Sequence, residues 1–179
     1  TVTPVAVSDH CAEVRFHGWD ADGVLRISEC LVTGDVLVEP SAYSSRPGVR
    51  ACRWNLYGVD PEQQLVAPVY QGIRLPLSDP LIQGAHWSWP LLWEAGFAVM
   101  QGHDGGFWVR AEDTSYRYKA LGVGVAGAPQ SLSFDTESYG PLDANLGSGG
   151  LVWRLNTHQG DWRVPAGLYR DWLWQAYNL

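Results

Sequence analysis

The chain has 179 residues, of which 46% are hydrophobic and 17% charged, a balance that fits one globular domain with its own core. The net charge is −7, so a basic groove for phosphate backbones is not expected and nucleic acid is disfavoured as a partner. No apolar run reaches the roughly 18 residues of a membrane span. The opening TVTPVAVSDH lacks the blocks of a signal peptide, although a processed secreted chain would look the same, so the compartment stays unknown.

Two residue types bound the function further. The three cysteines, Cys11, Cys30 and Cys52, have neither CxxC spacing nor a nearby histidine pair. We therefore expect buried free thiols, no metal and no cofactor. The ten tryptophans and eight tyrosines exceed what a core of this size requires. Because tryptophan is rarely buried completely, some of these rings should contact a ligand, another domain or a partner.

The first third of the chain is predicted to form hairpins. Residues 11–16 and 24–31 alternate apolar with polar side chains, the period of a half-buried strand, and Asp22-Gly23 lies between them as a turn signal. A third strand, 36–39, is expected to stop at Pro40, and 41–50 has the composition of a loop. Further strands are predicted at 51–57, 65–70, 73–77, 116–125, 130–134 and 150–156.

The most apolar stretch, residues 87–100, is predicted to be a strand or a bent pair of strands. Pro90 and Gly96 argue against one continuous helix. A turn at 102–106 and a returning strand at 107–111 complete a hairpin with it. Since no strand alternates with a long helix, a parallel α/β sheet is disfavoured. The pattern favours an all-β fold, an antiparallel β-sandwich followed by a C-terminal α-helix.

That helix is predicted over residues 164–177. Pro165 fits a first helical turn, and Asp161 upstream suits a cap or the helix dipole. One apolar stripe is expected to pack on the sandwich, made of Leu168, Tyr169, Trp172, Leu173, Ala176 and Tyr177. Trp174 lies off the stripe and is expected either to lie along its own helix or to contact a further domain. With no glycine cap in the sequence, we expect 1–179 to be one domain whose helix leads onward, with Trp172 and Trp174 at the interface.

No catalytic residue is predicted. The sequence has no nucleophile elbow and no phosphate-binding loop, and its histidines are scattered. Asp20 to Gly23 resembles the start of a calcium loop, but a plain turn explains it better because the later ligands are missing. A facing pair of acids, as glycosidases use, could come from Glu94, Glu112, Asp113, Asp135, Glu137, Asp143 and Asp161.

The aromatic residues are better candidates for binding. Sugar rings stack their C–H faces on tryptophan and tyrosine while their hydroxyls pair with polar side chains. If residues 87–93 stay in one strand, Trp87, Trp89 and Trp93 share a face, and Trp108 lies across the hairpin. These four rings either bind sugar or fill the core. Two further candidates in loop-like segments are Trp19 and Tyr43.

Several segments together resemble the N-terminal β-sandwich of bacterial glycoside-hydrolase-like proteins. They are QGIRLPLSDP, WPLLWEAGFAVMQGHDGGFWVRAED, YRYKALGVG, ESYGPLD and GLVWRLNTHQGDWRVPAGLYRDWLW, and they span roughly residues 65–177. In those proteins a sandwich of galactose-mutarotase-like type precedes a (β/α)8 catalytic barrel. The resemblance implies a supporting, non-catalytic domain, with carbohydrate and a downstream catalytic domain as partners.

Three functions are therefore in competition. The leading one is the supporting sandwich of a glycoside hydrolase that contributes to glycan binding. The second is a stand-alone carbohydrate-binding module or lectin, which needs an exposed array of rings. The third, a small hydrolase with two facing carboxylates, is the least favoured.

Overall fold

The computed structural model describes residues 1–18, 21–138 and 143–178, and in them two antiparallel sheets and one helix. The sheets have ten and four strands, and helix α1 spans Arg163–Tyr177. The predicted fold class, an all-β sandwich with a C-terminal helix, is confirmed. No helix in the described part of the chain is long and apolar enough to cross a membrane.

The larger sheet carries both early hairpins and the 97–111 hairpin. Its order is β1 (Val2–Ser8), β2 (Cys11–Phe16), β3 (Asp22–Cys30), β4 (Asp35–Tyr43), β14 (Trp153–Gln159), β10 (Gly105–Ala111), β9 (Phe97–Gln101), β6 (Gln64–Ala67) and β7 (Ile73–Pro76). The short β13 (Gly147–Ser148) pairs with β4. In the β9–β10 turn, a Cβ on Gly106 would collide with the backbone oxygen of Met100, which explains the glycine there.

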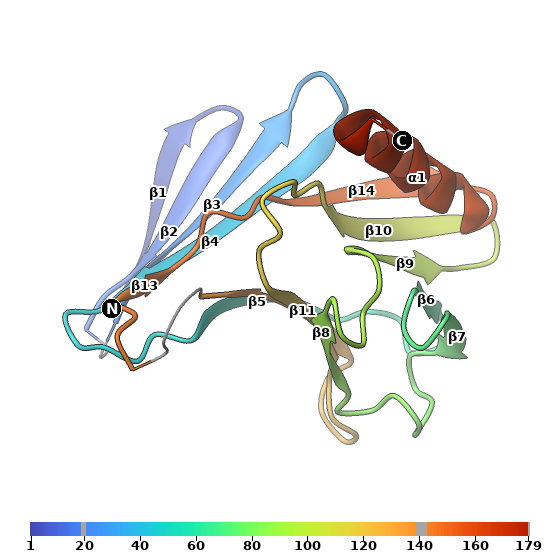
Figure 1. The fold of residues 1–179 in the computed structure, drawn as a ribbon, viewed down its shortest axis with the longest axis horizontal. Coiled ribbons are helices and arrows are strands. Elements are labelled where there is room, and N and C mark those ends of the chain that lie inside the picture. Colours follow the sequence, from blue (N-terminus) through green and yellow to red (C-terminus); the bar gives the residue numbers. More distant parts are fainter. Residues whose placement is uncertain (19–20, 139–142, 179) are drawn as a thin grey trace.

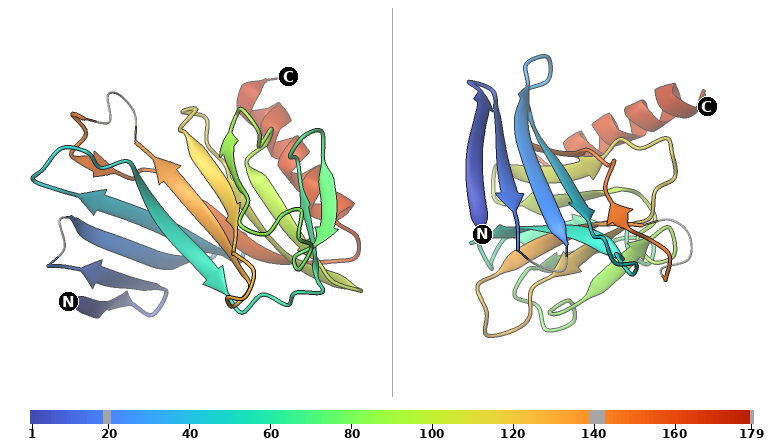
Figure 2. Two further views of the ribbon diagram at one scale, coloured as in Figure 1. Left: turned by 90° about the horizontal axis from the view of Figure 1, so that it is seen from below. Right: turned by 90° about the vertical axis from the view of Figure 1, so that its left-hand side faces the viewer.

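The smaller sheet consists of β5 (Ala51–Tyr57), β12 (Ser131–Glu137), β11 (Lys119–Val123) and β8 (His86–Trp89), in that order. Figure 1 shows the larger sheet between this sheet and α1. The view from below in Figure 2 shows the four strands side by side. Because ten strands face four, the inner side of the first strands extends beyond the smaller sheet.

The main core lies between the two sheets and is rich in rings. Trp93 and Trp153 stack with centroids 6.2 Å apart and planes 7° apart, and Phe134 lies 5.2 Å from Trp153. The ring nitrogens of both tryptophans donate hydrogen bonds, Trp153 to the Thr136 hydroxyl at 3.1 Å and Trp93 to the Phe97 carbonyl at 3.0 Å. Burying aromatic surface with its polar atoms paired stabilises this layer.

Successive side chains of β10 point to opposite faces of the larger sheet, so the strand contributes to two separate hydrophobic clusters. Val109 and Ala111 belong to the core between the sheets, whereas Trp108 belongs to a second cluster beneath the helix. In that cluster Tyr169 of α1 lies 4.9 Å from the Phe97 ring, and the Gly96 N–H donates to its hydroxyl at 3.2 Å. Burial raises the pKa of Tyr169 to about 12.

The helix begins and packs largely as the sequence predicts. The predicted cap at Asp161 is wrong: the N-cap is Trp162, which makes no side-chain capping hydrogen bond, and Asp161, one residue upstream, accepts a hydrogen bond from the Arg163 N–H at 3.0 Å. Tyr169 is buried, and Trp172, Leu173, Ala176 and Tyr177 are partly buried. The prediction was wrong for Leu168, which is exposed because it lies at the outer edge of the stripe.

Two strand predictions need correction. The strand β1, which contains Pro4, was not expected; it lies at the edge of the sheet, where one side is unpaired and a proline is tolerated. Strand β4 continues through Pro40 to Tyr43, because its partners β14 and β13 pair on either side of that proline. Of the two forms predicted for residues 87–100, one strand or a bent pair, the structure has two strands, β8 in the smaller sheet and β9 in the larger one.

A buried ion network ties β4 to the middle of the larger sheet. Asp35 accepts two hydrogen bonds from Arg110, at 3.0 and 2.8 Å, and one from Arg154 at 3.0 Å. Burial alone would raise the pKa of Asp35, but its hydrogen bonds from Arg110, Thr33 and Asn156 outweigh it and lower that pKa to about 2. The Arg110 guanidinium also lies 4.2 Å from the centroid of the Trp108 ring.

Candidate functional site

The structure places three of the predicted sugar-stacking rings in the interior. Trp93 is 0% exposed, Trp87 is also in the main core, and Trp108 is buried beneath the helix. The expected shared face does not form, because β8 ends at Trp89 and Trp93 lies in the following loop, bridged to Val69. In this fold the rings of Trp87, Trp93 and Trp108 contribute to packing, the alternative that the sequence left open.

The other predicted rings have different surroundings. Trp89 is partly buried; the Lys119 ammonium lies 3.8 Å from its centroid and the Tyr116 ring at 6.4 Å. Burial lowers the pKa of Lys119, although Asp113, 3.1 Å away, opposes that shift. Tyr43 ends β4 and is 60% exposed, so its ring is accessible. Trp19 lies outside the described residues.

The two predicted interface tryptophans of α1 differ from each other. Trp172 packs on its own domain, with its centroid 5.1 Å from Tyr169 and 6.3 Å from Tyr177. Trp174 is 58% exposed and points away from the sandwich. At 100° per residue, Val164, Leu168 and Trp174 fall in a sector of about 120°, which also contains Asp171, Gln175 and Asn178, so the exposed side of the helix mixes apolar with polar residues.

A polar depression covers the outer face of the smaller sheet. We call it the polar trough, and its volume is about 740 Å³. One row of facing residues crosses it, Asn55, Ser133, Gly122 and His86, and a second row contributes Arg53 and Asp135. The alternation of β5 and β12 places these polar side chains outside and Trp54, Leu132 and Phe134 inside.

Asp135 organises the polar trough. Its carboxylate is almost fully buried and accepts two hydrogen bonds from Arg53, Nε to Oδ1 at 2.6 Å and Nη2 to Oδ2 at 2.7 Å. His86 Nε2 lies 3.0 Å from Oδ2 on the other side. The bidentate hydrogen bond to Asp135 raises the pKa of Arg53. Asp135 therefore holds a cation and an imidazole in fixed positions at the surface.

The sequence does not reveal this cluster, although it contains one signal. Residues 51–57 and 131–137 both alternate polar with apolar side chains, which indicates a polar outer face for each strand. Arg53 and Asp135 are 82 positions apart, however, and His86 is 49 from Asp135. Only the pairing of β5 with β12 and of β8 with β11 brings them together.

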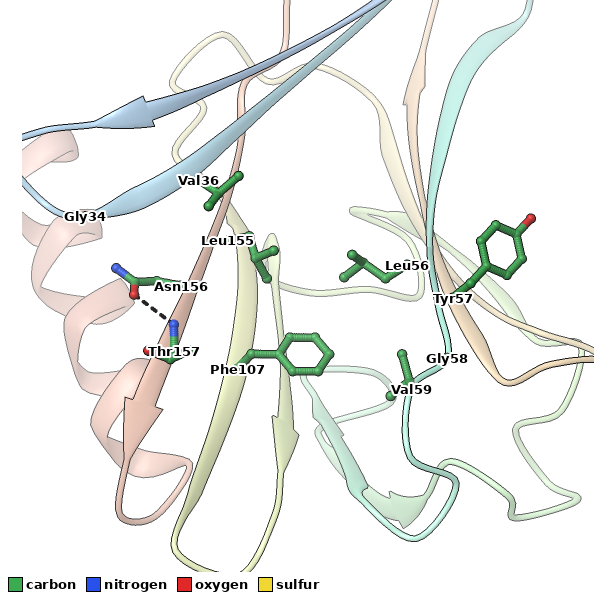
Figure 3. Close-up of a pocket in the computed structure, with 10 residues that line it drawn as sticks. All are labelled: Gly34, Val36, Leu56, Tyr57, Gly58, Val59, Phe107, Leu155, Asn156 and Thr157. Carbon is green, nitrogen blue, oxygen red and sulfur yellow. Dashed lines mark hydrogen bonds between the residues drawn. The ribbon is translucent and has the colours of Figure 1, made fainter. Parts of the chain in front are cut away.

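A second depression is apolar and lies between the sheets. Val36, Leu56, Val59, Phe107 and Leu155 converge on a cleft of about 470 Å³, as Figure 3 shows. It lies between the end of β5 on one side and strands β14 and β10 on the other. The Tyr57 side chain points away from this cleft, toward the outer side of β5. The cleft carries few polar groups, so it offers little to a hydroxyl-rich ligand.

Neither depression holds a cluster of metal ligands. In residues 1–18, 21–138 and 143–178, no group of three or more His, Cys, Asp and Glu side chains could hold a metal ion. Of the acids that the sequence offered as a facing pair, Asp135 and Glu137 line the polar trough. The Asp135 carboxylate is engaged by Arg53 and His86, which suits positioning better than proton transfer.

Comparisons with known proteins place the fold. No protein-family model and no curated protein matches the chain. Alpha-N-acetylgalactosaminidase NagBb from Bifidobacterium bifidum, ligand-free and as its GalNAc complex, aligns in both structures with a TM-score of 0.60 at 15% identity. The alignment covers 97% of this chain but 30% of that one, so the chain has the fold of part of a bacterial glycoside hydrolase.

A third solved structure is less similar. The Slr1438 protein from Synechocystis sp. PCC 6803 aligns with a TM-score of 0.48 at 12% identity, over 88% of this chain and 66% of that chain.

Proposed function

We propose that the chain is a non-catalytic β-sandwich domain of a glycoside hydrolase, which supports a (β/α)8 catalytic barrel and contributes to glycan binding. One observation carries the proposal: nearly the whole chain, 97% of it, aligns in fold with 30% of the length of an alpha-N-acetylgalactosaminidase. A piece of that size suits an accessory domain. The galactose-mutarotase-like resemblance of segments within 65–177 points the same way.

The outer face of the helix supports a neighbouring domain. Trp174, Leu168 and Val164 expose apolar surface to solvent, where it does not stabilise an isolated domain. Trp172, in contrast, faces the sandwich, where it packs against the cluster that contains Val66, Val99 and Trp108. The two tryptophans thus take different roles in the proposed domain interface: Trp172 packs the helix on the sandwich, and Trp174 contacts the barrel.

The experiment compares this 179-residue chain with a longer protein that includes the coding sequence after Leu179. Trp174→Ala should leave the unfolding free energy of the short chain unchanged. In the longer protein it should cost about 2 kcal/mol, because burial of a large apolar side chain is lost. Arg170→Ala, an exposed change on the same helix, is the control and should be neutral in both.

Two results would contradict the supporting role. One is a longer protein without glycosidase activity on any α- or β-linked aryl glycoside tested. The other is an equal effect of Trp174→Ala on both proteins, which would make the ring part of this domain alone. For the glycan-binding part, GalNAc is the first probe, because the solved relative was crystallised with it.

A further inference from the structure

We propose that the polar trough on the outer face of the smaller sheet is a saccharide-binding site, with Tyr57 as its stacking ring and a neutral oligosaccharide as its ligand. The inference deepens the glycan-binding part of the proposed function and rests on it. It does not depend on the contact between the helix and a barrel. The site contains none of the rings that the sequence suggested.

The first argument is that the polar groups are already fixed before a ligand arrives. The Arg53–Asp135 pair uses Nε and Nη2 of the guanidinium, and within the described residues Nη1 makes no hydrogen bond. His86 is held through Nε2, so its Nδ1 edge remains for a ligand. Groups that are held in place lose little entropy on binding, which favours affinity for a weakly binding ligand such as a sugar.

The second argument is the shape of the floor. Gly122 lies in the middle of the row between Ser133 and His86, and a Cβ there would collide with the Ser133 hydroxyl. The Ser133 hydroxyl therefore lies over Gly122, and the centre of the floor presents a hydroxyl where a larger side chain would otherwise stand. Asn55 and Ser133 stand beside this floor and can both donate and accept hydrogen bonds, as a sugar hydroxyl requires.

The third argument is the exposed ring at the end of β5. Tyr57 is 70% exposed, and it lies on the same side of β5 as Arg53 and Asn55 because the three alternate with buried residues. Figure 3 shows its side chain directed away from the apolar cleft. Tyr57 is not itself among the residues that line the polar trough, but its strand partner Ser131 is. An accessible ring beside hydroxyl-binding groups is the usual arrangement for stacking a sugar.

The fourth argument is the charge balance, which selects the ligand class. Two cations, Arg50 and Arg53, and two carboxylates, Asp135 and Glu137, line the polar trough. Paired charges of both signs offer donors and acceptors without a net field, so neither an acidic nor a basic ligand gains much. A neutral ligand rich in hydroxyls fits this lining better than a sulfated or sialylated glycan does.

The test is a glycan array with neutral, sialylated and sulfated oligosaccharides, followed by calorimetric titration of the chain with the best neutral hit. Tyr57→Ala and Asn55→Ala should each weaken binding about tenfold or more, since each removes a stacking or hydrogen-bonding partner. Arg53→Lys keeps the charge but loses the fork on Asp135 and should weaken binding to a similar degree. Thermal unfolding of each variant checks that the domain still folds.

Tyr43→Ala is the matched control, because Tyr43 is similarly exposed but belongs to the larger sheet. It should leave binding unchanged. If Tyr43→Ala abolishes binding and the three trough variants do not, the site is elsewhere: this inference fails while the glycan-binding function stands. A preference for sulfated or sialylated glycans would overturn the ligand class. No binding of any glycan would overturn both the site and the glycan-binding function, and would leave the supporting role to the helix experiment.

Discussion

The two outward faces of the sandwich are built by the same alternation of side chains but have opposite character. Where α1 covers β9 and β10, the outward residues are large: Trp108 packs in the cluster with Tyr169, and the guanidinium of the buried Arg110 lies over the Trp108 ring. Where no element of the described chain covers β5, β12 and β11, the outward residues are small or polar, such as Asn55, Ser133 and Gly122. The comparison teaches that ring content alone does not identify a binding face in this protein. Trp54, Trp108 and Trp153 lie where the domain covers them, whereas the accessible face carries small and polar residues together with the exposed ring of Tyr57.

The strongest test of this comparison removes one central carboxylate from each face. Asp35→Asn should cost about 3 kcal/mol of unfolding free energy, because it removes one of the two carboxylates, Asp35 and Glu112, that pair with the buried Arg110. Asp135→Asn should cost only about 1–2 kcal/mol, because Arg53, whose side chain is 52% exposed, can turn to water. Urea unfolding of both variants measures the difference. Equal losses would mean that the polar trough is as structural as the covered face.

A second test uses acid. The folded-state pKa of Asp35 is lowered to about 2, so its stabilising contribution is present above the unfolded pKa, near 4, and is lost as the pH falls toward 2. The size of this loss is about 2 kcal/mol. Unfolding titrations between pH 5 and pH 2 should show it in the wild type and not in Asp35→Asn. A variant with the same acid profile as the wild type would assign the effect to another group.

A third test compares one tyrosine from each face. Tyr169→Phe should cost about 1 kcal/mol at neutral pH, because the Gly96 N–H loses its acceptor. Burial raises the pKa of Tyr169 to about 12, so its contribution is complete below pH 10 and is lost as the pH rises toward 12. Tyr57→Phe should change the stability of the domain neither at neutral pH nor at alkaline pH. Calorimetric melting temperatures at neutral and alkaline pH decide between the two outcomes.

The smallest effect concerns reactivity rather than stability. The Thr33 side chain and the backbone N–H groups of Thr33 and Val32 lower the pKa of Cys30 to about 7, whereas burial raises the pKa of Cys52. Cys30 should therefore react with iodoacetamide at pH 7 roughly tenfold faster than Cys52, or more. Mass spectrometry of the labelled chain gives the order. Faster labelling of Cys52 would mean that the inner side of β5 opens readily.

Local patterns predicted much of the fold but little of the candidate site. The limits of β2 and β5, the 97–111 hairpin and the terminal helix follow from alternation, turn residues and an apolar stripe within a few positions of one another. Strand order has no such local signal. The polar trough depends on β5 lying beside β12, and β11 beside β8, although these strands are far apart in the chain.

The positions of the tryptophans in the fold were also only partly predictable from the sequence. The sequence identifies that they are numerous and that Trp174 lies off the apolar stripe, and Trp174 is indeed exposed. It cannot tell a ring that fills the core from one that stacks on a ligand, because both positions select the same residue type. Trp93 and Trp108 are buried by neighbours from distant strands and from the helix, and no pattern near them in the sequence records that.

The stacked core of Trp93, Trp153 and Phe134 has a practical consequence for spectroscopy. Rings held this closely away from water should emit at short wavelength and shift strongly to the red when the domain unfolds. Among the described residues that line the polar trough there is no tryptophan, so a sugar bound there should leave the emission spectrum nearly unchanged. Intrinsic fluorescence therefore reports folding in this protein, and a silent emission spectrum during a sugar titration carries no information about whether the sugar is bound.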